Sequence, residues 1–415
     1  MKVSILRTVL RGFHNALLIA ESKWPYLLSV LSLLFLAVTL LLDSKRPLSN
    51  DELFTFYISQ QRTLHDVWSA LLTGAEQLPI FFFMVTRMFT GLFGPSPIGL
   101  RLPETLGFLL MNVCTFLFVR RRVPASYSFV AFIFPAVTDA YYFAFEARPY
   151  GLVMGFCGLA MLCWQSAAEG RKQPLSLVGT ALFLACAVNC HYYAVLLLLP
   201  FGMAELVRYF ERRKFDWGLY IAIAVSVLPL IFSLPVIRAS SKYSSHFWAK
   251  PSWTSLISFY ENLLLPAALA LMLIALISGL SMYWRTDELQ KRRWEEQPPA
   301  HEFALAIGFV LLPTVAVCLA KFVTGAFTSR YAIYTVIGLS ILLAWSLAKI
   351  GRNTRVLGLV LAGITVGCWL IVAVRNYQQF VANAVAQDKT FEFLSSASTE
   401  LPVVIASPHQ FFVQS

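Results

Sequence analysis

Eleven long apolar runs constrain the fold of this chain more than any other feature. A bilayer core about 30 Å thick is crossed by a helix of about 20 apolar residues, so each run predicts a membrane span. Composition agrees, because 58% of the 415 residues are hydrophobic and 13% are charged, whereas soluble domains carry about 25% charged residues. The sequence predicts an all-α polytopic membrane protein. The predicted spans are 26–42, 98–119, 124–143, 149–168, 175–190, 194–208, 217–237, 263–284, 303–321, 331–348 and 356–374.

One further apolar run, residues 78–93, is not predicted to cross the membrane. Its sixteen residues reach about 24 Å as a helix, which is short of the ~30 Å core. Arg87 lies in the middle of the run, where a charge inside the bilayer would cost roughly 2.5–3.5 kcal/mol. We therefore expect this segment to lie in the outer interface of the membrane.

Basic residues fix the predicted orientation. With the N-terminus inside, the predicted cytoplasmic loops hold 20 of the 33 Lys and Arg residues, as the positive-inside rule requires. The formal charge of +11 therefore has an explanation in topology, and it does not indicate nucleic-acid binding. Residues 1–24 are expected to form an amphipathic helix on the cytoplasmic surface. The C-terminus is predicted to lie outside.

Two domains are predicted. Residues 1–374 form the transmembrane domain, whose first outer loop, 43–97, is expected to carry interfacial helices. Residues 375–415 form an outer tail. In this tail a polar, helix-compatible segment precedes residues 402–406, which are predicted to form a strand, so the tail resembles the start of a small α/β domain.

Asp51 and Glu52 are adjacent carboxylates in the first outer loop, directly after the first span. One interpretation is structural, because an acidic residue at a helix N-terminus caps the helix or stabilises its dipole. The other is functional, because a carboxylate in a cleft at the membrane surface can act as a general base. The residues alone leave both interpretations open.

Three more candidate groups lie at outer helix ends. Glu146, Arg148 and Tyr150 stand between the third and fourth spans, where ionisable residues near apolar surroundings favour a functional role over an exposed ion pair. His191 and Tyr192 end the fifth span, either in the site or as structural and interfacial residues.

Arg330 and Tyr331 open the tenth span. The guanidinium fork of Arg330 matches phosphate oxygens, although an arginine in this position can also extend to lipid headgroups. The chain contains no P-loop, GxSxG, HExxH or GxGxxG motif, so nucleotide hydrolysis, serine hydrolysis and zinc-protease chemistry have no support.

These pieces, in this order, resemble the GT-C glycosyltransferase superfamily over about residues 25–350. The most similar branch contains aminoarabinose transferase, the RgtA/B/C/D-like lipopolysaccharide sugar transferases and protein mannosyltransferase-like enzymes. That branch has an acidic pair after the first span, a sequence like Glu-Ala-Arg-x-Tyr after the third, a His-Tyr pair and a late Arg-Tyr pair. Many relatives also have His-Pro-Pro or Lys-Pro-Pro before the interfacial helix, and here residues 76–79 read Glu-Gln-Leu-Pro.

The resemblance implies a hexosyl- or pentosyltransferase that moves a sugar from a polyprenyl-phosphate donor to a cell-envelope lipid, glycan or protein. Asp51 would take the acceptor proton, and Arg330 and Arg148 would hold the leaving phosphate. Glu146 would stabilise an oxocarbenium-like transition state or orient Arg148.

The expected location is the bacterial inner membrane. No cofactor is implied with certainty, and dependence on a divalent metal stays open, since Asp51, Glu146 and His191 are the candidate ligands nearest to a set. A lipid or small-solute transporter is the alternative from another class, although it would place ionisable residues near the bilayer midplane. A non-catalytic assembly protein is a third interpretation.

Overall fold

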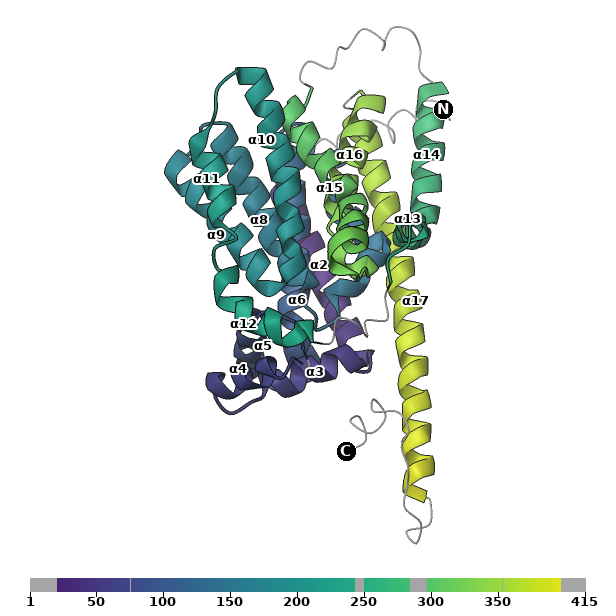
Figure 1. Cartoon of the computed structure of the whole chain (residues 1–415). Helices are drawn as coiled ribbons and strands as arrows, with labels where there is room; N and C mark the ends of the chain where they lie inside the picture. The colour runs from purple at the N-terminus through teal and green to yellow at the C-terminus, as the bar shows by residue number, and fades with distance from the viewer. Residues whose placement is uncertain (1–20, 75, 243–249, 284–296, 353, 397–415) are drawn as a thin grey trace, which may run out of the picture.

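The structure is a computed structural model that describes residues 21–74, 76–242, 250–283, 297–352 and 354–396. Helices form all of the regular structure in these ranges, which confirms the predicted all-α class. They run side by side as a bundle (Figure 1). The predicted strand at 402–406 and residues 1–20 of the predicted N-terminal helix lie outside the described residues.

Every one of the eleven predicted spans has a helical counterpart. Nine helical stretches in the described ranges are long and apolar enough to cross a membrane, and Ala125–Val137 and Thr335–Ile350 are shorter apolar helices. The helices of the bundle are α2 (Trp24–Lys45), α6 (Pro97–Arg120), α7 (Ala125–Ile133), α8 (Tyr150–Ala168), α9 (Gln173–Cys190), α10 (Leu198–Arg212), α11 (Trp217–Val225), α12 (Leu230–Ser241), α13 (Thr254–Leu264), α14 (Ala268–Tyr283), α15 (Ala300–Leu319), α16 (Thr335–Ile350) and α17 (Arg355–Ser396).

The third predicted span, 124–143, is not one continuous α-helix. Helix α7 ends at Ile133, and two 3-10 helices follow, η1 (Phe134–Val137) and η2 (Asp139–Ala144). Pro135 has no backbone N–H to donate to the preceding turn, which favours an end or a kink of the α-helix at this point. The chain therefore bends before it reaches the turn that holds Glu146 and Arg148.

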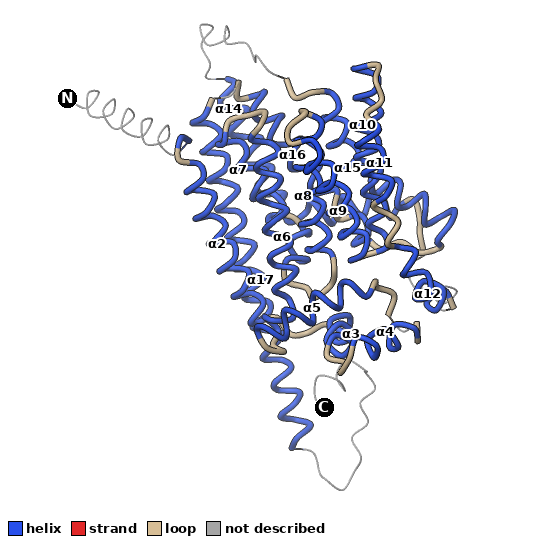
Figure 2. The backbone as a smooth tube through the Cα atoms, turned by 90° about the vertical axis from the view of Figure 1, so that its left-hand side faces the viewer, coloured by secondary structure: helices blue, strands red, loops and turns tan. Residues whose placement is uncertain are grey.

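Three short helices cover one end of the bundle, which we call the α3–α5 end (Figure 2). They are α3 (Asn50–Ser59), α4 (Leu64–Leu72) and α5 (Ile80–Phe93). The predicted interfacial segment 78–93 contains α5, and Arg87 within it donates to the carbonyls of Ser59 (3.1 Å) and Arg62 (2.9 Å). Arg87 thus satisfies carbonyls at the C-terminus of α3, which explains a charged residue in an apolar run.

Glycines let α6 and α8 cross in direct backbone contact. A Cβ atom on Gly151 would lie 2.4 Å from the carbonyl oxygen of Glu104, and one on Gly107 would lie 2.5 Å from that of Gly151. Small residues allow this close approach in membrane helix pairs. The Glu104 carboxylate then accepts the backbone N–H of Leu152 at 2.8 Å, in the first turn of α8.

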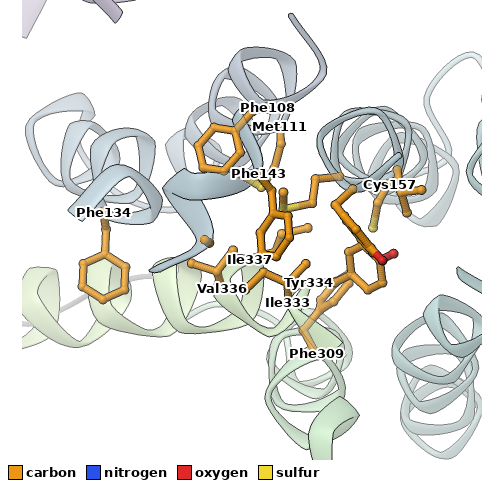
Figure 3. Close-up of a cluster of buried hydrophobic side chains, with 14 of the residues drawn as sticks. Phe108, Met111, Phe134, Phe143, Cys157, Phe309, Ile333, Tyr334, Val336 and Ile337 are labelled. Carbon is orange, nitrogen blue, oxygen red and sulfur yellow. The ribbon is translucent and has the colours of Figure 1, made fainter. Parts of the chain in front are cut away.

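A hydrophobic core packs beneath the α3–α5 end. Figure 3 shows Phe108 and Met111 of α6 beside Phe143, and Phe309 of α15 beside Ile333 and Tyr334, which precede α16. Ile333 and Tyr334 are almost completely buried, so they anchor the short segment that carries Arg330. Helix α17 continues across the predicted domain boundary at residue 374, and its last turns extend beyond the α3–α5 end (Figure 1).

Candidate active site

Asp51 and Arg330 form an ion pair at the α3–α5 end. The Nη1 atom of Arg330 lies 2.5 Å from the Oδ2 atom of Asp51, although 279 residues separate them in sequence. Asp51 lies in the first turn of α3, and Arg330 lies in the 3-10 helix η8 (Ser329–Ala332). The two side chains are 40% and 25% exposed, so this pair can be reached from outside the bundle.

A second arginine lies on the other side of Asp51. Arg148 is buried, donates to the Glu76 carboxylate at 2.7 Å and donates to the backbone carbonyl of Asp51 at 3.3 Å. Partial burial opposes ionisation of Asp51, but Arg148 and Arg330 outweigh it and lower the pKa of its carboxyl below the ordinary value. Asp51 is therefore a carboxylate at neutral pH.

Glu52 points the opposite way and is completely buried. Its two oxygens accept from Nε (2.6 Å) and Nη2 (2.9 Å) of Arg101, and Oε1 also accepts the backbone N–H of Ala147 at 2.8 Å. Oε2 accepts the backbone N–H of Ser49 at 2.8 Å, which closes a capping box at the start of α3. Burial raises the pKa of Glu52, but Arg101 outweighs it and the pKa falls to about 2.

Glu52 thereby ties three segments together: the N-terminus of α3, the start of α6 and the turn before α8. This arrangement fixes the position of its neighbour, Asp51. The sequence-based structural interpretation of the acidic pair, a helix N-terminus, therefore describes Glu52, whose side chain is held inside the protein, while the Asp51 side chain faces outward.

Glu146 lies below this layer and is 5% exposed. The Arg46 guanidinium reaches both acidic side chains, with Nη2 3.7 Å from Glu146 and Nη1 3.5 Å from Glu52. Arg46 also stacks on the ring of Tyr142, 4.4 Å from its centroid. Burial raises the pKa of Glu146 to about 7 despite the nearby Arg46, so this carboxyl changes charge close to neutral pH.

Aromatic rings form the wall next to Arg330. His191 lies 5.2 Å from Tyr150 and 5.5 Å from Tyr331 between ring centroids, and Tyr193 stacks on Tyr331 at 4.0 Å. Burial first, and then Arg148 and Arg330, lower the pKa of His191 to about 3, so its ring is neutral. Tyr192, which was predicted to lie in the site, does not take part in this stack of the described rings.

Most of the predicted site residues therefore meet at one end of the bundle. Sequence reasoning assigned no site role to Arg46 or Arg101, and it named Glu76 only as a departure from relatives. Arg101 was the easiest of these to find, because a charged residue within a predicted span needs a partner. No three His, Cys, Asp or Glu side chains in the described ranges are arranged to hold a metal ion, and Asp51 and Glu76 each have an arginine as partner.

Two solved structures share this arrangement of helices, ArnT from Cupriavidus metallidurans in the apo state and ArnT bound to undecaprenyl phosphate. Each is 15% identical to this chain, and each alignment covers 95% of this chain and 85% of ArnT. The TM-scores are 0.61 for the apo state and 0.59 for the bound state. The chain has the GT-C fold. The fold that the sequence resemblance to the GT-C superfamily implied is therefore confirmed.

A second comparison matches part of this chain. Residues 77–237 match the family described as dolichyl-phosphate-mannose-protein mannosyltransferase. This region contains Glu146, Arg148 and His191, whereas Asp51 and Arg330 lie outside it. No curated protein matches the sequence.

Proposed function

We propose that this protein transfers a sugar from a polyprenyl-phosphate donor to an acceptor of the cell envelope. The observation that supports the proposal is the contact between Asp51 and Arg330, the two residues to which we assign the roles of base and phosphate-binding group. A similar GT-C structure was solved with undecaprenyl phosphate bound. That ligand is the part of such a donor that remains when the sugar leaves.

The reaction needs one bond to form and one to break. The acceptor hydroxyl oxygen attacks the anomeric carbon, and the bond between that carbon and the phosphate oxygen breaks, with inversion at the carbon. Asp51 takes the hydroxyl proton, and polyprenyl phosphate leaves as an anion. Arg330 holds the leaving phosphate, because its fork can donate to two phosphate oxygens at once.

Donor binding must separate the Asp51–Arg330 pair. Arg330 stabilises the charged form of Asp51 and so weakens it as a base. When the donor phosphate takes over the guanidinium, the Asp51 carboxylate becomes available to the acceptor hydroxyl and its pKa rises. The base is then strongest when the donor is in place.

The remaining site residues have supporting roles in this proposal. Arg148 is held by Glu76 and adds positive charge beside the phosphate. Glu52 positions Asp51 through the capping box of α3.

The sugar lies against aromatic rings in this proposal. Tyr150, His191 and Tyr331 supply these rings, and because all three are buried in the described structure, donor binding must also expose the aromatic faces that pack against the sugar.

Charge distribution supports transfer at the outer face of a bacterial inner membrane. The α3–α5 end carries the site, while the opposite end carries basic side chains such as Arg122, Arg212 and Lys349. Basic residues mark cytoplasmic loops. The N-terminus is then cytoplasmic and the end of α17 is periplasmic.

The test is mass spectrometry of envelope lipids, glycans and proteins from a strain that lacks the gene. We expect one sugar modification to disappear, to return with the wild-type gene and to stay absent with Asp51→Asn. Asp66→Asn is the matched control, because Asp66 is an exposed aspartate in the same loop, and it should restore the modification. A strain that loses no sugar but redistributes a lipid between leaflets would instead indicate a transporter.

A further inference from the structure

A cavity of about 440 Å³ lies at the end of the bundle opposite the α3–α5 end. It lies between the turn that joins α8 to α9 and the turn that joins α10 to α11, which are neighbours in Figure 1. Three basic side chains line it, from Arg208, Arg212 and Lys214. The proposed transfer reaction uses none of them.

The acidic side chains in the cavity wall already have cationic partners. Glu169 pairs with Arg121 (3.0 Å), Arg122 (2.6 Å) and Arg171 (3.0 Å). Asp216 pairs with Arg208 at 2.9 Å. Arg212 and Lys214 are exposed, so they give the cavity an excess of positive charge.

The backbone adds to this positive field. Helices α9 and α11 both begin at the cavity, with Gln173 and Trp217 in its lining. Helix N-termini carry partial positive charge and unpaired N–H groups. Arg208 is 4% exposed, and its Nε atom has no hydrogen-bond partner among the described residues.

Aromatic residues place the cavity at the level of lipid headgroups. Phe215 and Trp217 line it, and they are 47% and 67% exposed. Their rings stack with centroids 5.5 Å apart. Exposed aromatic rings beside basic side chains at the end of membrane helices are typical of the membrane interface.

We propose that this cavity binds the phosphate of an anionic lipid headgroup, such as that of phosphatidylglycerol, from the leaflet at this end. Arg212 and Lys214 donate to the phosphate oxygens, while the two helix N-termini stabilise its charge. Phe215 and Trp217 pack against the glycerol and upper acyl carbons. The site is separate from the sugar-transfer site.

The experiment measures the melting temperature of the purified full chain in neutral detergent against added lipid. The probes are phosphatidylglycerol, phosphatidylcholine with the same acyl chains, and inorganic phosphate. The variants are Arg212→Gln and Lys214→Gln. Arg213→Gln is the matched control, because it removes the same charge from the same turn but from a side chain outside the cavity lining.

We expect phosphatidylglycerol to stabilise the wild type and the Arg213→Gln variant at the same concentration. Each of the other two variants should need about tenfold more lipid, which corresponds to one charge-assisted hydrogen bond. If inorganic phosphate saturates the site with the same dependence on Lys214, the phosphate chemistry holds and the ligand is a soluble anion. Equal stabilisation by phosphatidylcholine, or equal behaviour of Lys214→Gln and Arg213→Gln, would overturn the proposal.

Discussion

Replacing Glu52 by Gln tests the buried layer that positions Asp51. The substitution keeps the shape but removes the charge, and it turns an NH₂ group towards the Arg101 guanidinium, so one donor faces another. The Glu52 pKa is about 2, against an ordinary value of 4.5. At about 1.4 kcal/mol per pKa unit, ionisation of Glu52 stabilises the fold by roughly 3 kcal/mol. Loss of a partner from a buried ion pair typically costs about 3–5 kcal/mol.

Thermal unfolding of the full chain in detergent measures this loss at neutral pH. A carboxyl whose pKa is lowered in the folded state stabilises the fold at pH values above its unfolded-state pKa. This contribution is lost as the pH falls from about 4.5 towards 2. Glu52→Gln should therefore be much less stable at pH 7, and its stability should fall less steeply below pH 4.5.

Asp66→Asn is the control, since Asp66 closes the same kind of capping box with Thr63 but is exposed. A loss no larger for Glu52→Gln than for Asp66→Asn would refute the reasoning.

Three other changes have defined outcomes. Glu146→Gln should remove one pH dependence of the melting temperature. The Glu146 carboxyl has a pKa raised to about 7 in the folded state, so its protonated form stabilises the fold fully below pH 4.5, and this contribution is lost as pH rises through 7. Arg148→Ala should cost about 3–5 kcal/mol by leaving Glu76 buried and unpaired, and a double-mutant cycle with Glu76→Ala should recover much of this. Gly151→Ala should destabilise the α6–α8 crossing in melting experiments, whereas Gly202→Ala, which meets open space, should not.

The sequence was sufficient to predict where the apolar helices lie, because each depends on a local run of apolar residues. It also identified most of the candidate site residues that lie at the α3–α5 end, because ionisable side chains are conspicuous among apolar neighbours. It did not predict the break after Ile133, because residues 134–143 continue the same apolar run in the sequence, although they include Asp139. Pro135 was the local signal for this break, but a proline can either end a helix or be accommodated within it, so the sequence alone did not decide between the two.

The sequence could not predict which distant residues form ion pairs with each other. Asp51 and Arg330 were each predicted for the site, yet no local pattern says that they bind each other across 279 positions. In the same way, Arg101 and Glu52 lie 49 positions apart, on different helices. Glu76 appeared only as a departure from relatives, and its contact with Arg148 gives it a role in this chain.

Binding of polyprenyl phosphate tests the central claim most directly, because this product is common to every sugar that the donor could carry. The measurement is a binding isotherm for the purified full chain with undecaprenyl phosphate and, separately, with undecaprenol. We predict saturable binding of the phosphate form, no comparable binding of the alcohol, and affinity weakened roughly ten- to a hundredfold in Arg330→Ala by loss of a charge-assisted contact. Equal binding of both lipids, or unchanged affinity in Arg330→Ala, would contradict the account.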